Sequence, residues 1–306
     1  MKKPNFFIVG AGGCGTTALY EYLNSHPNIF MSNPKETHYF STDISKESRV
    51  FTKLEQYLEL FQKAGTKHIA VGEACPSYLY PSKEALRNIY QFNKSAKIIV
   101  TIRNPVDMVY TSYFSQLNFN GLNEDQESFE KAWHLQDMRR QGQMLPKYCR
   151  EPRLLQYGQI GKLGEHLERV YSIFPQEHVK IIIFDDFITS TQKIYQEILS
   201  FLGVEDDNRT EFIKINDSKK VYNIRWLHVF TQVPPQFLSH ILNHWKPIRD
   251  IKNSIVEQVN GWNSIKAERP PLDENFRKEL EDFFHDDVKK LSELVGKDLM
   301  HWVESS

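Results

Sequence analysis

Near the N-terminus, residues 6–23 read FFIVGAGGCGTTALYEYL, and this stretch decides the fold. It opens with a short apolar run of strand length, and Gly10 is followed by three more glycines within five residues. From Thr16 onward, apolar residues recur at the spacing of one buried helix face. A strand, a glycine-rich turn and a helix in this order present backbone N–H groups and the positive end of a helix to an anion. Glycine suits such a turn because the backbone must adopt positive φ and approach the ligand closely. The stretch therefore predicts a binding site for a phosphate-like group.

The spacing of this turn is similar to that of the Walker phosphate loop, G-x-x-x-x-G-K-[ST], but Thr16 stands where that loop has lysine. In nucleoside triphosphatases the lysine reaches the β- and γ-phosphates. Its absence argues against an ordinary ATPase or kinase and for a smaller anionic group. The alternative is a tight strand-to-helix turn without a ligand, but the two threonines at the helix start favour a phosphate site.

The composition excludes several classes of function. The chain has 306 residues and a formal net charge of −1, so no general attraction to nucleic acid or to a membrane surface is expected. No apolar run approaches the length of a membrane span. Three cysteines are few, odd in number and not spaced for a metal, which indicates a reducing, cytoplasmic setting. His240 and His244 lie four residues apart without an evident third ligand, so we predict no metal site.

Further apolar runs of strand length occur at residues 29–31, 69–73, 96–102 and 179–184. Helical patterns alternate with them, among them residues 47–63 and, near the C-terminus, residues 272–294. Strands alternating with helices indicate right-handed βαβ units and a sheet covered on both faces. The expected fold class is α/β, P-loop-like, with a central and mainly parallel β-sheet flanked by helices, in one domain over residues 1–306.

Two other sites combine residue types that bear on function. Residues 33–40 read NPKETHYF and place Lys35, Glu36 and His38 beside two aromatic residues, a pattern equally typical of a surface loop. Arg103 ends the run at residues 96–102, and Ser112 lies two turns along the helix that follows. An arginine at a strand end with a hydroxyl on the adjoining helix suits a second phosphate. A surface arginine and a serine bonded to its own helix are the alternative.

Several separated segments together resemble one family, the sulfotransferases that use 3′-phosphoadenosine 5′-phosphosulfate, especially the bacterial and heparan-sulfate-type branch. The resembling segments are residues 9–23, 35–40, 72–80, 99–112, 184–187 and 294–299. Each segment alone is a weak signal, whereas the set in this order is specific and spans most of the chain.

The resemblance implies a role for each matching residue. The 5′-phosphosulfate would be held by Gly12, Gly13, Cys14, Gly15, Thr16 and Thr17. Arg103 and Ser112 match the pair that binds the 3′-phosphate. Glu36 matches the general base that takes the acceptor proton, with His38 and Lys35 beside it. The family often has a basic loop that closes over the nucleotide, and at that place this chain has Lys219, Lys220 and Arg225.

One position departs from the family pattern. The family's loop usually carries a lysine, sometimes an arginine, where this chain has Gly13. That cation stabilises the charge that develops on the phosphate leaving group. We hypothesise that Lys35, or a lysine of the later basic loop, replaces it from another direction.

The expected activity is transfer of a sulfuryl group to a hydroxyl or amine of a carbohydrate or small metabolite, without a metal. Segments 118–150 and 216–250 are the candidates for covering the acceptor and the nucleotide. Two alternatives stay open at this point. One is a P-loop kinase or NTPase, and the other is a non-catalytic nucleotide-binding protein, which the missing lysine at Gly13 would suit.

Overall fold

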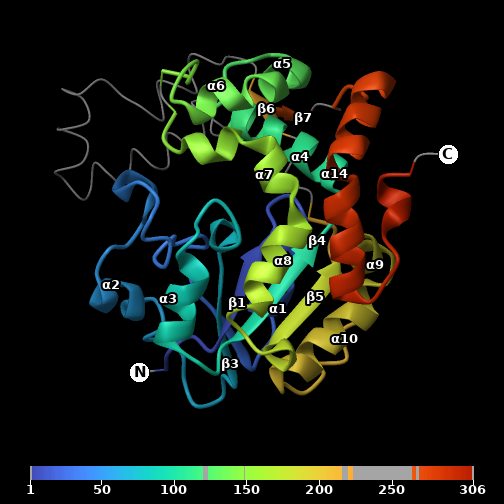
Figure 1. Ribbon diagram of the computed structural model, residues 1–306. Coiled ribbons are helices and arrows are strands. Elements are labelled where there is room, and N and C mark those ends of the chain that lie inside the picture. The colour runs from blue at the N-terminus through green and yellow to red at the C-terminus, as the bar shows by residue number, and fades with distance from the viewer. Residues whose placement is uncertain are drawn as a thin grey trace. The chain divides into compact units, whose positions relative to one another are not determined.

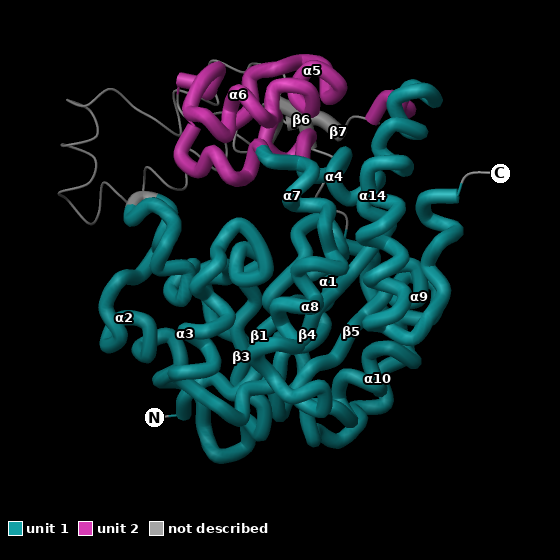
Figure 2. The backbone as a smooth tube through the Cα atoms, viewed as in Figure 1, with its two compact units in different colours: residues 1–112, 156–216, 273–306 teal, residues 113–155, 217–272 magenta. Residues whose placement is uncertain are grey.

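The computed structural model describes residues 2–119, 123–147, 149–215, 220–222, 264–266 and 269–304. The chain divides into two compact units, which Figure 2 colours separately. Unit 1 comprises residues 1–112, 156–216 and 273–306, and unit 2 comprises residues 113–155 and 217–272. The segments 118–150 and 216–250, which the sequence sets apart, fall almost entirely in unit 2. The expectation of one domain over residues 1–306 stays a prediction.

Unit 1 is built on a five-stranded sheet in the order β2-β3-β1-β4-β5, in which every neighbouring pair is parallel. The strands are β1 (Phe6–Gly10), β2 (Ile29–Met31), β3 (Ala70–Ala74), β4 (Lys97–Ile102) and β5 (Val179–Ile183). All five residues of β1 are buried, as expected for the central strand of a covered parallel sheet. The predicted α/β fold class is thus confirmed, and each predicted strand lies within one residue of its predicted bounds.

Helices follow the strands along the chain of unit 1. They are α1 (Thr16–Asn24), α2 (Leu54–Glu59), α3 (Ala85–Phe92), α4 (Pro105–Phe114, whose last two residues belong to unit 2), α7 (Tyr157–Gly161), α8 (Leu163–Tyr171), α9 (Phe184–Thr189), α10 (Thr191–Leu202) and α14 (Glu274–Val295). Several ends carry the expected caps. The Asn104 side chain accepts a hydrogen bond from the backbone N–H of Val106 at 2.9 Å, and Gly203 and Gly296 end α10 and α14 in the left-handed conformation.

Both faces of the sheet are covered. On one face a buried core cluster joins Phe6 and Ile8 of β1 to Leu19 and Leu23 of α1 and to Ile198, Leu199 and Leu202 of α10. Helices α3 and α8 lie over the other face, in front of the sheet in Figure 1, and α14 runs alongside α8. Burial of these apolar side chains is the main contribution to the stability of the unit.

The helix predicted over residues 47–63 is shorter than its pattern. A 3₁₀ turn occupies Lys46–Ser48, and α2 itself begins only at Leu54. Between them the chain is held by tertiary contacts, because the backbone N–H of Val50 donates to the carbonyl of Thr37 at 3.0 Å. The Arg49 guanidinium donates to the carbonyl of Tyr39 at 2.8 Å. These bonds hold residues 49 and 50 against the loop at residues 35–40, so the pattern cannot continue as one helix.

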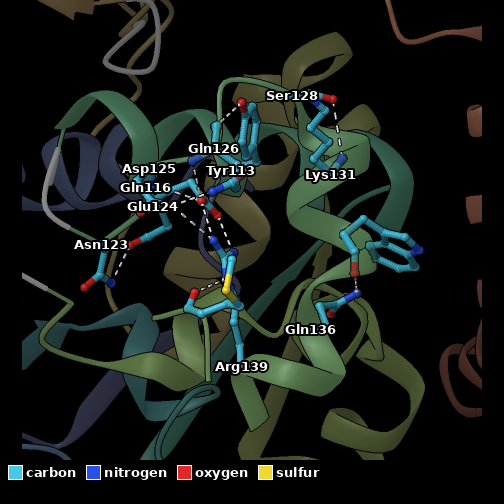
Figure 3. A network of polar contacts seen from close by, with 12 residues as sticks. Tyr113, Gln116, Asn123, Glu124, Asp125, Gln126, Ser128, Lys131, Gln136 and Arg139 are labelled. Atoms are coloured by element: carbon cyan, nitrogen blue, oxygen red, sulfur yellow. Dashed lines mark hydrogen bonds and ion pairs between the residues drawn. The ribbon is translucent and has the colours of Figure 1, made fainter. Parts of the chain in front are cut away.

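Unit 2 contains α5 (Phe129–His134), α6 (Gln136–Arg140) and an antiparallel pair of β6 (Lys220–Tyr222) with β7 (Ser264–Lys266). In the described part of the polar segment at residues 118–150, the structure has the helices α5 and α6 and a buried ion pair, which Figure 3 shows. Arg139 donates to the two carboxylate oxygens of Glu124 at 2.7 and 2.8 Å, and both side chains are fully buried. Two parallel N–H···O bonds of this kind fix the orientation of the guanidinium relative to the carboxylate.

Candidate functional site

The glycine-rich turn lies between β1 and the start of α1 and connects them through left-handed backbone. Gly13 has φ 76° and Gly15 has φ 81°. A Cβ atom would lie 3.1 Å from Cγ2 of Thr111 at Gly13, and 3.1 Å from ring carbons of Phe184 at Gly15. The positive φ favours glycine at both positions, and the tight fit around a Cβ atom adds to that preference. The four residues that open α1, TTAL, carry no charge, so the helix end keeps its positive partial charge for an anion.

The lysine and glutamate of the loop at residues 35–40 lie at this turn. Nζ of Lys35 lies 3.3 Å from Oγ1 of Thr17, the second residue of α1. The same Nζ donates to Oε1 of Glu36 at 2.6 Å. The Lys35 side chain is 17% exposed and that of Glu36 is 44% exposed, so the carboxylate is the more open to a second substrate. A carboxylate, a cation and a helix N-terminus thus lie close together.

His38 has a fixed environment in the same loop. Its Nδ1 lies 2.7 Å from Oγ of Ser77 and 3.4 Å from Sγ of Cys75. Burial lowers the pKa of His38, while Glu36 acts to raise it and Lys35 to lower it. The ring is therefore neutral near pH 7. Ser77 escaped the sequence analysis because nothing in the spacing connects it to a residue 39 positions earlier.

The backbone of this loop is unusual at two positions. Glu36 has φ 62° and His38 has φ 54°, both in the left-handed region that favours glycine. For residues other than glycine, such backbone conformations cost about 1–3 kcal/mol each, and they persist only when contacts with the surrounding structure stabilise them. The residue between them, Thr37, is fully buried.

Arg103 reaches the glycine turn from the end of β4. Its Nη1 donates to the carbonyl of Gly13 at 3.4 Å, and its guanidinium lies 4.7 Å from the ring centre of Phe184. A cation over an aromatic face keeps its charge and gains a defined orientation. Ser112 lies on α4, half-buried, two turns beyond Pro105.

The thiol of Cys14 is fully buried inside the turn, and burial raises its pKa to about 12. Its Sγ faces the carbonyl of Gly12 at 3.6 Å. Cys14 is accordingly a protonated packing residue that offers a ligand only its backbone N–H.

The remaining predicted residues cannot be placed at the site. Lys219, Arg225, His240 and His244 lie outside the described residues. Lys220 belongs to β6 in unit 2, and its side chain is not among those described. In the described part of the chain, no three His, Cys, Asp or Glu side chains gather closely enough to hold a metal ion.

Comparison with known proteins places the chain in a family. The family model that describes the sulfotransferase domain matches residues 3–223 of this chain. The chain belongs to the sulfotransferase domain family. This confirms the resemblance found in the sequence, and the family is one of transferases.

Individual relatives are distant. A mouse heparan sulfate glucosamine 3-O-sulfotransferase 5 is 24% identical over 231 residues, which cover 76% of this chain and 62% of the relative. A membrane-associated sulfotransferase, kil1, from Dictyostelium discoideum is 31% identical over 135 residues, which cover 43% of this chain and 27% of the relative. The chain therefore spans less than two thirds of the length of these curated relatives.

A sulfotransferase from Alicyclobacillus acidocaldarius has a similar structure, with a TM-score of 0.71 and 24% sequence identity over 99% of this chain and 100% of that one. At this identity the likeness supports the fold. Among the described residues, no helix is both long and apolar enough to cross a bilayer.

Proposed function

We propose that this chain transfers a sulfuryl group from 3′-phosphoadenosine 5′-phosphosulfate to a hydroxyl or amine of an acceptor. The observation that carries the proposal is that Nζ of Lys35 contacts both the Thr17 hydroxyl at the start of α1 and the Glu36 carboxylate, in a chain of the sulfotransferase family. A carboxylate close to a helix N-terminus, which suits a phosphate-like group, supports this proposal.

The donor would lie on the glycine turn. Backbone N–H groups of residues 12–17, with the hydroxyls of Thr16 and Thr17, would hold the phosphosulfate at the positive end of α1. Arg103 and Ser112 would hold the 3′-phosphate. In this assignment Arg103 exchanges its contact with the Gly13 carbonyl for the phosphate, which is the stronger acceptor.

The transfer is an in-line displacement at sulfur. The acceptor oxygen or nitrogen forms the new bond to sulfur, while the bond from sulfur to the 5′-phosphate oxygen breaks. Adenosine 3′,5′-bisphosphate leaves with the electron pair of that bond, and the acceptor proton passes to the carboxylate of Glu36. The exposure of the Glu36 carboxylate supports this role, since an acceptor must reach it.

Lys35 would supply the cation that Gly13 lacks. The left-handed backbone of Gly13 disfavours a side chain at that position, and a Cβ atom there would lie 3.1 Å from Cγ2 of Thr111, a tight contact. Lys35 instead brings Nζ to the Thr17 hydroxyl from the neighbouring loop. From there it can stabilise the charge that develops on the departing phosphate.

The proposed acceptor is a carbohydrate or a small hydroxylated or aminated metabolite. The carbohydrate class draws support from relatives that are named heparan sulfate and carbohydrate sulfotransferases. The proposed compartment is the cytoplasm, which suits the three free cysteines.

The test is transfer of ³⁵S from labelled donor to a panel of sugars and small alcohols or amines, with Glu36→Gln as the matched variant. We expect the parent protein to label at least one acceptor. Glu36→Gln should bind adenosine 3′,5′-bisphosphate as the parent does, but lose about 10²–10⁴ in turnover, the usual contribution of a general base. Preserved turnover in this variant would remove Glu36 from the base role. Bisphosphate binding without any transfer would favour the non-catalytic alternative that Gly13 suggests.

A further inference from the structure

A buried carboxylate lies directly beneath the loop at residues 35–40. Glu73 belongs to β3, opposite Phe7 of β1, and its side chain is fully buried. Oε2 accepts a hydrogen bond from the Tyr57 hydroxyl at 2.6 Å. Oε1 accepts one from the Tyr78 hydroxyl at 2.7 Å and another from Oγ1 of Thr37. Three hydroxyls thus donate to a group that, when ionised, can only accept.

This arrangement is costly for a purely structural purpose. Among the described residues no lysine, arginine or histidine forms an ion pair with Glu73. Burial raises the pKa of Glu73, and the three hydroxyls act against that rise by lowering it. An apolar side chain at the same place would avoid the cost of desolvating a carboxylate. The three hydrogen bonds instead fix the positions of the hydroxyl groups that donate to Glu73.

One of the three donors, Thr37, lies at the centre of the candidate catalytic loop, residues 35–40. Thr37 lies between the two left-handed residues, Glu36 and His38. Its hydroxyl donates to Glu73 and accepts from the backbone N–H of Tyr39 at 3.2 Å. The loop is therefore fixed at its midpoint, with one residue of unfavourable backbone conformation on either side.

The other two donors extend this hold along the loop. The Tyr78 hydroxyl accepts from the backbone N–H of Phe40 at 3.5 Å, a long contact. The Tyr57 ring stacks on Tyr39, with centres 4.3 Å apart and planes within 9° of parallel. Glu73 therefore acts on three residues of the loop. It contacts Thr37 directly, and its donors Tyr57 and Tyr78 contact Tyr39 and Phe40.

We propose that Glu73 is a positioning residue for the sulfuryl transfer. By accepting hydrogen bonds from Thr37, Tyr57 and Tyr78, it maintains the strained backbone on either side of Thr37, at Glu36 and His38. The proposal rests on the proposed function for its catalytic consequence. The hold on the loop itself does not depend on which reaction the loop serves.

The experiment compares Glu73→Gln, Thr37→Val and Thr37→Ser with a control, Thr189→Val. The amide of Glu73→Gln keeps the shape of the side chain, but its Nε2 donates where the carboxylate accepted, so at least one hydroxyl loses its bond. Thr37→Val removes the loop hydroxyl at nearly constant shape, and Thr37→Ser restores a hydroxyl. Thr189 is an exposed residue whose hydroxyl bonds only within its own helix, to the carbonyls of Asp185 and Asp186.

Two readouts are taken at a temperature where each variant is folded. In Glu73→Gln and Thr37→Val we expect kcat to fall by about a hundredfold, the effect of misplacing a reacting group by about 1 Å. Affinity for adenosine 3′,5′-bisphosphate should change little, and Thr37→Ser should recover most of the turnover. Turnover in Glu73→Gln and Thr37→Val equal to that of Thr189→Val would overturn the proposal.

The second readout is the His38 ring signal in nuclear magnetic resonance spectra, assigned by its disappearance in His38→Gln. It should move in Glu73→Gln and Thr37→Val and stay in Thr37→Ser and Thr189→Val. An unmoved signal in the first two variants overturns the proposal even if the parent protein transfers sulfate. If the parent binds the bisphosphate but labels no acceptor, the proposed function fails, and a moved signal still supports the hold of Glu73 on the loop.

Discussion

Replacement of Lys35 by alanine should slow sulfuryl transfer far more than it weakens nucleotide binding. Nζ of Lys35 contacts the Thr17 hydroxyl at 3.3 Å and the Glu36 carboxylate at 2.6 Å. It therefore lies between the proposed leaving-group site and the proposed base. In the proposed complex the donor already has its hydrogen bonds to the turn before the reaction, so the charge that Lys35 would stabilise develops mainly in the transition state.

The size of the effect follows from the exposure of the two side chains. Loss of one preorganised stabiliser of a developing oxyanion typically costs about 3–4 kcal/mol, or two to three orders of magnitude in rate. Lys35 is 17% exposed, which shields its charge from water only in part, and it shares that charge with Glu36, which is 44% exposed. We therefore expect the lower end of the range, about a hundredfold in kcat.

The assay is single-turnover transfer from labelled donor at saturating acceptor, with calorimetric titration of adenosine 3′,5′-bisphosphate on the same preparations. Lys94→Ala, which removes an exposed lysine of the same unit, is the matched control. Lys35→Arg keeps the charge and should retain much of the rate. Full turnover in Lys35→Ala would refute the substitution of Lys35 for the missing loop lysine, and a loss of bisphosphate binding as large as the loss of rate would show that Lys35 acts in binding.

Two further predictions concern stability. Arg139→Met removes the buried guanidinium that pairs with the Glu124 carboxylate and should lower the free energy of unfolding by about 3–5 kcal/mol in urea titrations. Arg140→Met, at an exposed ion pair, should cost less than about 1 kcal/mol, and equal costs for the two variants would contradict the assignment. Burial lowers the pKa of His166 from 6.5 to about 3, so as the pH falls below 6.5 the unfolded chain takes up a proton there and the folded protein does not. Stability should consequently decline toward acid by about 1.4 kcal/mol per pH unit through this group. His166→Gln should lose that part of the decline and the exposed His301→Gln should keep it, whereas identical pH profiles for the two would disprove the role of His166.

Much of the fold could be predicted because its signals are local. The apolar run of β1, the glycines after it and the helical spacing after Thr16 lie within 18 consecutive residues, and the sheet strands repeat the same kind of run. Caps at Asn104 and Gly203 also act within a few residues of the sequence that specifies them. Parallel order then follows from the alternation of strands and helices.

What the sequence did not reveal depends on contacts between distant residues. Glu73 looks like an ordinary polar strand end, and its donors come from positions 37, 57 and 78, with no common spacing. The ion pair of Glu124 with Arg139 joins residues 15 apart across two segments. The late start of the helix predicted over residues 47–63 likewise depends on bonds of residues 49 and 50 to the loop at residues 35–40. Such tertiary contacts override local propensity and leave no periodic trace.

The contacts of Lys35 with the Thr17 hydroxyl and with the Glu36 carboxylate connect the loop at residues 35–40, which sequence alone left undecided, to the predicted anion site. The backbone around them needed the structure as well, because positive φ at Glu36 and His38 is not expected for these residue types. Functional loops often carry such strain, which is why sequence rules fail there first.

The central claim, that the glycine turn and Arg103 form a donor site for a 3′-phosphorylated nucleotide, is tested most directly by calorimetric titration. Adenosine 3′,5′-bisphosphate is compared with ADP and with ATP plus magnesium, on the parent protein and on Arg103→Ala. The account predicts clear preference for the bisphosphate, weakened in Arg103→Ala by about tenfold or more, as expected for loss of a charge-assisted hydrogen bond of about 1.5–3 kcal/mol. Preference for ATP with magnesium, or bisphosphate binding that Arg103→Ala leaves unchanged, would contradict it.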